Sequence, residues 1–285
     1  MRGNRSSMSP LQIIDMHIAA RKIASRSLPS HPKTRFEVCR TVWWNGDLVS
    51  EHYWLAQLRH RYGIGNAQTE LRAGIKLAEK IAKYWRKWNH LTGPSLFLEP
   101  RYLPNGRLIR DLPPRIDGVH FRFATAAILS LIVGKQISPI LLDVVPRTCD
   151  FGDIADDIHF LNYPDTCLVE ILQLGRRPRR WKEIMNFAER RFKNTQIPDN
   201  FEAYAELIIR CEKKQWNQAV KAVTRCEELY QNRPQSTGDR TYFEAWEAPL
   251  RDAPEGIDLR LAALMKYGFR ENSKQLKEVH SVHKW

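Results

Sequence analysis

Between residues 67 and 91 apolar side chains recur at steps of three and four positions, which places them along one face of an α-helix. The apolar positions are Leu71, Ile75, Ala78, Ile81, Ala82, Trp85 and Trp88. The opposite face carries the cations Arg72, Lys76, Lys80, Lys83 and Lys87. A helix of this length and polarity needs an apolar surface to cover its inner face. The segment therefore predicts a long basic helix packed on a core.

Two helical segments are expected before this one. Ser9 and Pro10 followed by Gln12 are typical of a helix start, with Ser9 as N-cap and Gln12 completing a capping box. The residues predicted to line one face of this first helix are Leu11, Ile14 and Ile18. The second segment is apolar-periodic over 36–44 and again over 49–62, and the Asn45-Gly46-Asp47 sequence predicts a turn that separates the two pieces.

The longest apolar run covers residues 123–134 and has 12 residues. This length is short of the roughly 20 residues that cross a bilayer, so we expect a buried core helix and no membrane span. The chain opens with polar residues rather than a basic and then apolar leader, which favours a cytoplasmic location. Ser138 and Pro139 then begin another short apolar segment, which ends near Val145.

The sequence of the C-terminal part of the chain predicts paired helices. Pro198 and Asp199 with Glu202 form a capping-box signal that opens a helix over 201–211, and a polar link leads to a second helix over 216–230. This αα-hairpin resembles a single tetratricopeptide unit in the spacing of three residues of its second helix, Trp216, Ala219 and Val223. No second copy follows at the 34-residue period of that family, so we expect helical-hairpin packing without a repeat array.

These signals predict an all-α fold of packed antiparallel helices and helical hairpins without an extended sheet. Proline and glycine are dense over 93–118 and exclude a long helix there. We accordingly expect a basic N-terminal lobe over 1–92, a connector over 93–118 and a C-terminal lobe of helical hairpins over 119–285, with one continuous domain as the alternative. The polar tail that begins at Ser273 is expected to fray.

Charge is distributed unevenly along the chain. The formal net charge is +13, and residues 1–110 alone hold 19 Lys and Arg against 7 Asp and Glu. A field of one sign steers an oppositely charged partner, so the N-terminal part predicts an acidic protein or a polyanion as partner. The candidate partner-binding residues are Arg72, Lys76, Lys80, Lys83 and Lys87, and secondly Arg176, Arg177, Arg179 and Arg180. A merely solubilising surface is the alternative.

Motifs for catalysis, cofactors and metals are missing from the sequence. The five cysteines form no CxxC pair, and no phosphate-binding loop or nucleophile elbow is present. The carboxylates that offer the best alternative, a divalent-cation site, are Asp150, Asp153, Asp156, Asp157 and Asp165, which also suit helix capping. We therefore predict no catalytic residue, no cofactor and no metal, and an enzyme of unrecognised type stays an alternative.

The segment 238–268 contains an aromatic-rich stretch with Tyr242 and Trp246, followed after a short loop by the apolar stretch 261–264. This order resembles the C-terminal part of helical immunity proteins of bacterial polymorphic-toxin systems, over about residues 163–268. The resemblance implies stoichiometric inhibition of a cognate toxin in the cell that makes both. Immunity proteins against nucleases tend to be acidic, so this basic chain suits a toxin of another chemistry with an acidic surface. The alternative is a nucleic-acid-binding protein that uses the basic N-terminal lobe.

Overall fold

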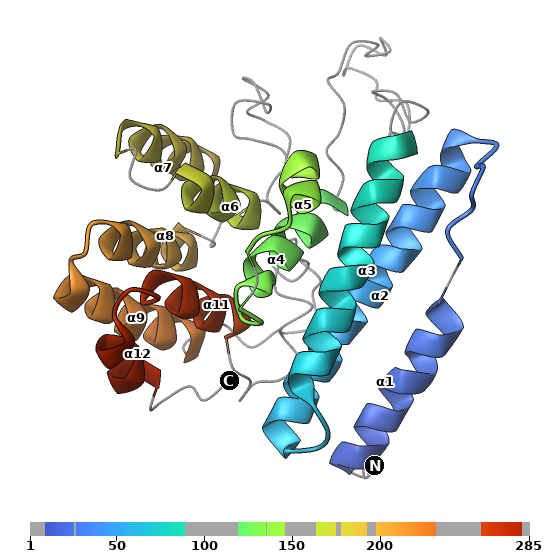
Figure 1. Ribbon diagram of the computed structural model, residues 1–285, viewed down its shortest axis with the longest axis horizontal. Coiled ribbons are helices and arrows are strands. Elements are labelled where there is room, and N and C mark those ends of the chain that lie inside the picture. Colours follow the sequence, from blue (N-terminus) through green and yellow to red (C-terminus); the bar gives the residue numbers. More distant parts are fainter. Residues whose placement is uncertain are drawn as a thin grey trace, which may run out of the picture.

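The computed structural model describes residues 9–25, 27–88, 119–134, 136–145, 164–174, 178–192, 198–231 and 258–280. Over these ranges the chain is built from helices and turns and contains no strand, which confirms the all-α prediction. The first three helices of the chain stand on one side of the molecule and the helices of its C-terminal half on the other, with one buried helix between them (Figure 1). The predicted connector over 93–118 lies outside the described residues.

The first three helices are α1 (Pro10–Ala24), α2 (Arg35–Tyr62) and α3 (Ala67–Trp88), and α2 and α3 are the two long ones. The predicted capping box is present at the start of α1, where Gln12 N–H donates to Ser9 Oγ and Ser9 N–H donates to Gln12 Oε1. Gly63 ends α2 with a left-handed φ of 62°, so the chain reverses tightly and α3 packs antiparallel to α2. Helix α1 lies along α2 at the edge of the molecule (Figure 1).

Helix α2 corrects the predicted turn at Asn45-Gly46-Asp47. The helix runs through these residues without interruption, and the Asn45 amide is buried where its Nδ2 donates to the Thr41 carbonyl at 2.8 Å. The side chain that signals a turn therefore bonds to its own helix, one turn back. Because Val42 and Val49 on either side are buried in the core, tertiary packing outweighs the local preference for a turn.

The contact between α2 and α3 is close at Gly74. A Cβ atom at this position would lie 2.6 Å from the Tyr53 ring and 3.0 Å from the His52 Cβ. The Tyr53 ring is itself 1% exposed, so it has no room to withdraw. Glycine at residue 74 thus lets the two long helices approach each other.

Helix α4 (Val119–Ser130) is the centre of the fold. Every side chain from Phe123 to Ser130 is buried, which confirms the predicted core helix over 123–130, whereas residues 131–134 form a turn after the helix. It contacts α2 and α3 on one side and α6 (Pro164–Leu174) and α11 (Leu259–Gly268) on the other. A helix that is apolar all round is expected in such a central position.

The remaining helices form the second side of the molecule. They are α5 (Pro139–Val144), α7 (Pro178–Phe192), α8 (Pro198–Glu212), α9 (Trp216–Gln231) and α12 (Ser273–His280). The predicted hairpin is confirmed as α8 and α9, which pack on each other with Ala219 and Val223 buried between them. The tail that was expected to fray is helical in α12, and the side chain of Val279 packs against the core.

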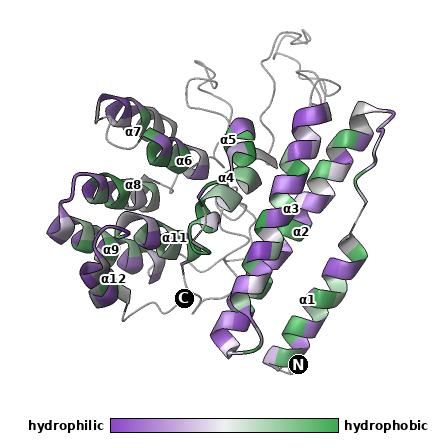
Figure 2. Ribbon diagram, viewed as in Figure 1, coloured by the Kyte–Doolittle hydropathy of each residue, from purple (hydrophilic) through white to green (hydrophobic). Residues whose placement is uncertain are grey.

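One cluster of buried apolar residues extends from Val38 in α2 to Phe269 after α11. It therefore includes residues from both predicted lobes. In Figure 2 the ribbons of α3 and α7 each carry both hydrophilic and hydrophobic parts, as expected for helices with one face on the core. Within the described residues no helix is both long and apolar enough to span a membrane.

Candidate interaction surface

The outer face of α3 carries a row of exposed cations. Its inner face buries Leu71, Ile75, Ala78, Ile81 and Ala82, as the periodicity predicts. Packing of this inner face fixes the rotation of the helix, so the opposite face must point to solvent. The five predicted cations of α3, namely Arg72, Lys76, Lys80, Lys83 and Lys87, are all exposed. We call these five residues the basic stripe.

The basic stripe is straight. Its members follow one another at steps of four, four, three and four residues, so at about 100° per residue they lie within an arc of about 80°. From Arg72 to Lys87 the helix rises by about 22 Å. Charges aligned in this way add to a field of one sign along the whole length of α3.

Most of the stripe has no acidic partner within the described part of the chain. Lys76, Lys80 and Lys83 form no ion pair there, and Arg72 bonds only to the Gln68 side chain of its own helix, at 3.1 Å. Lys87 lies over the Trp88 ring, 4.9 Å from its centroid. These cations therefore carry their charge into the solvent instead of neutralising a neighbour.

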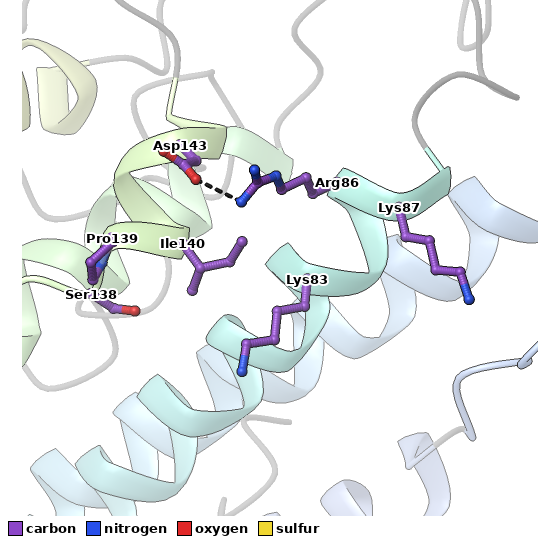
Figure 3. A pocket seen from close by; sticks show the side chains of 7 residues that line it. All are labelled: Lys83, Arg86, Lys87, Ser138, Pro139, Ile140 and Asp143. Carbon is purple, nitrogen blue, oxygen red and sulfur yellow. Dashed lines mark hydrogen bonds and ion pairs between the residues drawn. The ribbon is translucent and has the colours of Figure 1, made fainter.

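The C-terminal end of α3 borders a cavity of about 670 Å³ that opens toward α5. Arg86 reaches across it to Asp143 at 2.8 Å, whereas Lys83 and Lys87 extend away from this ion pair (Figure 3). Both members of the pair are more than half exposed, at 64% and 51%. Such a pair contributes little to stability and exchanges partners readily. Arg86 is thus a sixth cation that an incoming acidic group can recruit.

The aromatic residues of α3 do not extend the basic stripe as stacking surfaces. Tyr84 is buried, and Trp85 and Trp88 are partly buried against the core cluster. This confirms the interpretation of the two tryptophans as core residues. The stripe therefore offers charge and hydrogen-bond donors rather than open rings.

The second predicted cluster is not joined to the first. Arg176 and Arg177 lie outside the described residues, and Arg179 is exposed on α7. Arg180 pairs with Glu183 at 3.3 Å and lies 3.7 Å from Glu170. Helix α7 packs on α6 and α8, on the other side of the molecule from α3 (Figure 1). The two sets of cations therefore do not form one continuous surface among the described residues.

A buried polar cluster was missed by the sequence analysis. The Arg260 guanidinium donates to both oxygens of Asp165, at 2.7 Å and 3.0 Å, and Thr125 Oγ1 donates to Asp165 Oδ2 at 2.5 Å. The side chains of Asp165 and Arg260 are 0% and 3% exposed. Burial alone lowers the pKa of Arg260, but the Asp165 carboxylate raises it above its ordinary value. We call these three residues the Asp165 cluster, and it joins α4, α6 and α11.

A second buried bond supports the same region. Tyr204 on α8 donates to Asp258 Oδ2 at 2.5 Å, while Asp258 Oδ1 accepts from the Leu261 backbone and caps α11. Burial raises the pKa of Asp258, against the opposite effect of these hydrogen bonds, and burial likewise raises the pKa of Tyr204. The tyrosine thus keeps its proton and remains a donor. Both oxygens of each carboxylate are bonded, so neither aspartate is arranged as a metal ligand.

Among the acidic residues considered for a divalent cation, only Asp165 lies in the described part of the chain. Its oxygens are taken by Arg260 and Thr125. The described residues contain no group of three or more side chains suited to hold a metal ion. An aspartate directly after a proline is also typical of a helix start. Asp165 indeed lies in the first turn of α6, which begins at Pro164.

A third polar cluster joins the first three helices. The Glu70 carboxylate on α3 accepts from Arg21 of α1 at 2.7 Å and lies 3.0 Å from His52 Nδ1 of α2. Arg59 Nε of α2 lies 3.2 Å from the other carboxylate oxygen. Burial lowers the pKa of His52, although the bond to Glu70 opposes this effect. We call these four residues the Glu70 cluster. It could not be read from the sequence because its members come from three helices.

Another cavity, of about 540 Å³, lies between the end of α4, α6 and α11. Its walls are largely apolar, and two cations, Lys266 and Arg270, lie beside it. Lys266 Nζ donates to the Ile132 carbonyl at 2.5 Å, and Arg270 pairs with Glu212 at 3.0 Å. Because both cations are already bonded, they act as helix-end contacts and offer less to a ligand than the basic stripe does.

Comparison with known proteins assigns no family to this arrangement. No family model matches the chain, and no curated protein and no solved structure shows significant similarity to it.

Proposed function

We propose that this chain is a protein-binding inhibitor, an immunity protein that neutralises a cognate bacterial toxin by stoichiometric binding, and that the basic stripe of α3 contacts an acidic surface of that toxin. The observation that carries the proposal is the alignment of five exposed cations on a rigid helix, with Lys76, Lys80 and Lys83 unpaired among the described residues. The resemblance of the C-terminal part to helical immunity proteins supports the identity of the partner.

The stripe fits recognition of a folded acidic surface. Helix α3 is held on its inner face by the core, so its cations are presented without a large change of backbone on binding. Complementary charge accelerates association and rejects partners of the wrong sign. The Arg86–Asp143 pair adds one acidic group next to the cations, which suits a protein surface of mixed charge better than a uniform row of phosphates.

Nucleic-acid binding is the second candidate. A straight row of cations about 22 Å long also matches the repeated charges of a phosphate backbone. Base stacking is the other main contribution to binding of single strands. The partly buried positions of Trp85 and Trp88 do not favour it, and for this reason we place protein binding first.

The test begins with recovery of partners from lysates of the native host by the tagged full-length chain. Washing at about 0.5 M salt removes partners held only by long-range charge. Recovery of one protein at a ratio of one to one, encoded next to this chain and toxic when expressed alone, would support the proposal. If nucleic acid alone is bound before this wash and is lost at high salt, the result would overturn the proposal in favour of the second candidate.

The role of the stripe is tested with the recovered partner and a matched pair of variants. We expect Lys76→Glu/Lys80→Glu/Lys83→Glu to slow association by at least about tenfold at low salt. The control is Lys221→Glu/Lys274→Glu/Lys277→Glu, which makes the same change of net charge at exposed positions of α9 and α12. Equal association rates for the two variants would remove the stripe from the interface.

A further inference from the structure

Helix α1 is attached to the molecule by its inner face. Ile14 is buried with Leu55 and Leu58 of α2 in a small apolar cluster separate from the main core. His17 lies 3.0 Å from Glu51, and Arg21 donates to Glu70. The rotation of α1 about its axis is thereby fixed, so the face opposite these residues has to meet solvent or a partner.

Met16, Ala19 and Ile23 supply apolar side chains to that outer face. Leu11, Met16 and Ile23 are 56%, 47% and 76% exposed, and they are the exposed large hydrophobic residues of the described part of the chain. All three belong to one 15-residue helix. At about 100° per residue, Met16 and Ile23 lie about 20° apart around its axis, whereas Leu11 lies about 120–140° away from them on the side of Ile14. Ala19 and Ala20, also exposed, lie between Met16 and Ile23. Large apolar side chains gathered on one exposed surface indicate an interaction site more strongly than the same residues scattered singly.

The spacing of this face is that of a helix-pairing seam. Gln12, Met16, Ala19 and Ile23 follow one another at steps of four, three and four residues, which is the seam along which two helices pack side by side. Small alanine side chains in the middle let a second helix approach closely. The seam is short, at about one and a half heptads, and it ends where α1 ends.

Charge beside the seam shows which helix fits it. Asp15 and Lys22 are both exposed on the same flank of the seam, about 20° apart around the helix, and neither is paired among the described residues. If a second copy of α1 packs antiparallel about a two-fold axis near Ala19, equal flanks face each other. Asp15 of one copy then lies opposite Lys22 of the other, and the reverse pair forms at the same time. Met16 meets Ile23 under the same symmetry.

We infer that the outer face of α1 is a self-association surface, on which a second copy of this chain packs as an antiparallel helix pair centred on Ala19. The interface uses one short helix from each copy, so its area is below that of a standard stable dimer. We therefore expect a reversible dimer with a Kd in the micromolar range or weaker. The basic stripe belongs to α3 and takes no part, so both surfaces can be occupied at once.

Sedimentation of the full chain between about 1 µM and about 500 µM tests the inference, because this range brackets the expected Kd. We expect a monomer–dimer equilibrium that Ile23→Glu abolishes. The variant Lys76→Glu/Lys80→Glu/Lys83→Glu should leave it unchanged, so loss of the proposed toxin contact and loss of the dimer are separate results. A monomer over the whole range would overturn the inference.

Charge exchange tests the antiparallel register. Asp15→Lys alone and Lys22→Asp alone each place two like-charged pairs across the two-fold axis, and each should raise the Kd by roughly tenfold. Mixing these two variants creates two attractive pairs in the heterodimer and should restore association. Circular dichroism of each variant checks that α1 stays folded. Dimers insensitive to both single changes, or a mixture no tighter than its components, would exclude this arrangement.

A competing occupant of the same face is also distinguishable. If α1 instead binds a different protein, wild-type chain stays monomeric while Ile23→Glu abolishes capture of the recovered partner. That result would overturn self-association and would assign the face to the partner of the proposed function.

Discussion

Glu70 and Asp165 are both buried carboxylates that join helices from different parts of the chain, but their surroundings differ. Glu70 lies among two arginines and a histidine from α1 and α2, whose side chains are 13–22% exposed. Asp165 has one charged partner, Arg260, and both are almost completely buried. Charge in the first cluster is shared among several partly solvated groups. In the second cluster Asp165 depends on one cation, while the nearby Asp258 carboxylate also raises the pKa of Arg260.

This difference in solvent access and in number of partners determines how strongly stability depends on a single residue of each cluster. An ion pair removed from water is destabilised strongly when one partner is lost, because the remaining charge has neither water nor a counter-ion. A partly solvated cluster with redundant partners tolerates the same loss, because water and the other cations compensate. We therefore expect the side of the molecule built on α4, α6 and α11 to be sensitive to single changes and the α1–α3 side to be tolerant.

The largest effect is expected for Asp165→Ala, which leaves Arg260 buried without its carboxylate. We predict a loss of about 3–5 kcal/mol in the free energy of unfolding, measured by urea denaturation. The control is Asp165→Leu/Arg260→Met, which removes both charges and should be more stable than the single variant. A single variant as stable as the double variant would contradict the assignment of the pair as the source of this sensitivity.

Local patterns in the sequence were sufficient to predict which residues of α3 are exposed. The five cations of the basic stripe were predicted residue by residue, because a 3.6-residue periodicity needs only one helix to be visible. The capping box of α1 and the α8–α9 hairpin were predicted for the same reason. Whether the stripe binds a partner stays a prediction.

Tertiary contacts were not predictable in this way. Asp165 meets Thr125 and Arg260 across 40 and 95 residues of sequence, and no spacing rule connects such positions. Asn45 joins two predicted pieces of α2 because packing overrides its turn preference. Leu11, Ile14 and Ile18 are predicted to line one face of α1, but only Ile14 of the three is fully buried and Leu11 is exposed. The sequence does not show which part of this face is covered, because apolar residues surround α1 on several sides.

A smaller effect is expected for Arg21→Ala on the tolerant side. Arg59 still neutralises Glu70 and His52 still lies within hydrogen-bond distance of it, so the free energy of unfolding should fall by at most about 1 kcal/mol. The double variant Arg21→Ala/Arg59→Ala should lose more than the sum of the two single variants, because it removes both arginines from one carboxylate. Losses for Arg21→Ala as large as those for Asp165→Ala would show that the Glu70 cluster has no redundancy.

The smallest effect concerns pH. Burial lowers the pKa of His52 below its ordinary value of 6.5, and the nearby Arg21 cation adds to this effect, while the bond to Glu70 and the charge of Glu51 oppose it. The unfolded chain therefore binds more protons than the folded chain as pH falls through this value, so stability decreases toward acid. Burial lowers the pKa of His60 in the same direction.

We accordingly predict a lower Tm at about pH 5.5 than at about pH 7.5, with part of the decrease removed in His52→Asn and part in His60→Asn. Since Glu70 keeps Arg21 and Arg59 in either protonation state of His52, the decrease should be modest and should not detach α1. Thermal unfolding followed by circular dichroism measures both quantities. If His52→Asn loses as much stability toward acid as the wild-type chain does, its imidazole is not a source of this pH dependence. The charge that matters would then belong to His60 or to another group.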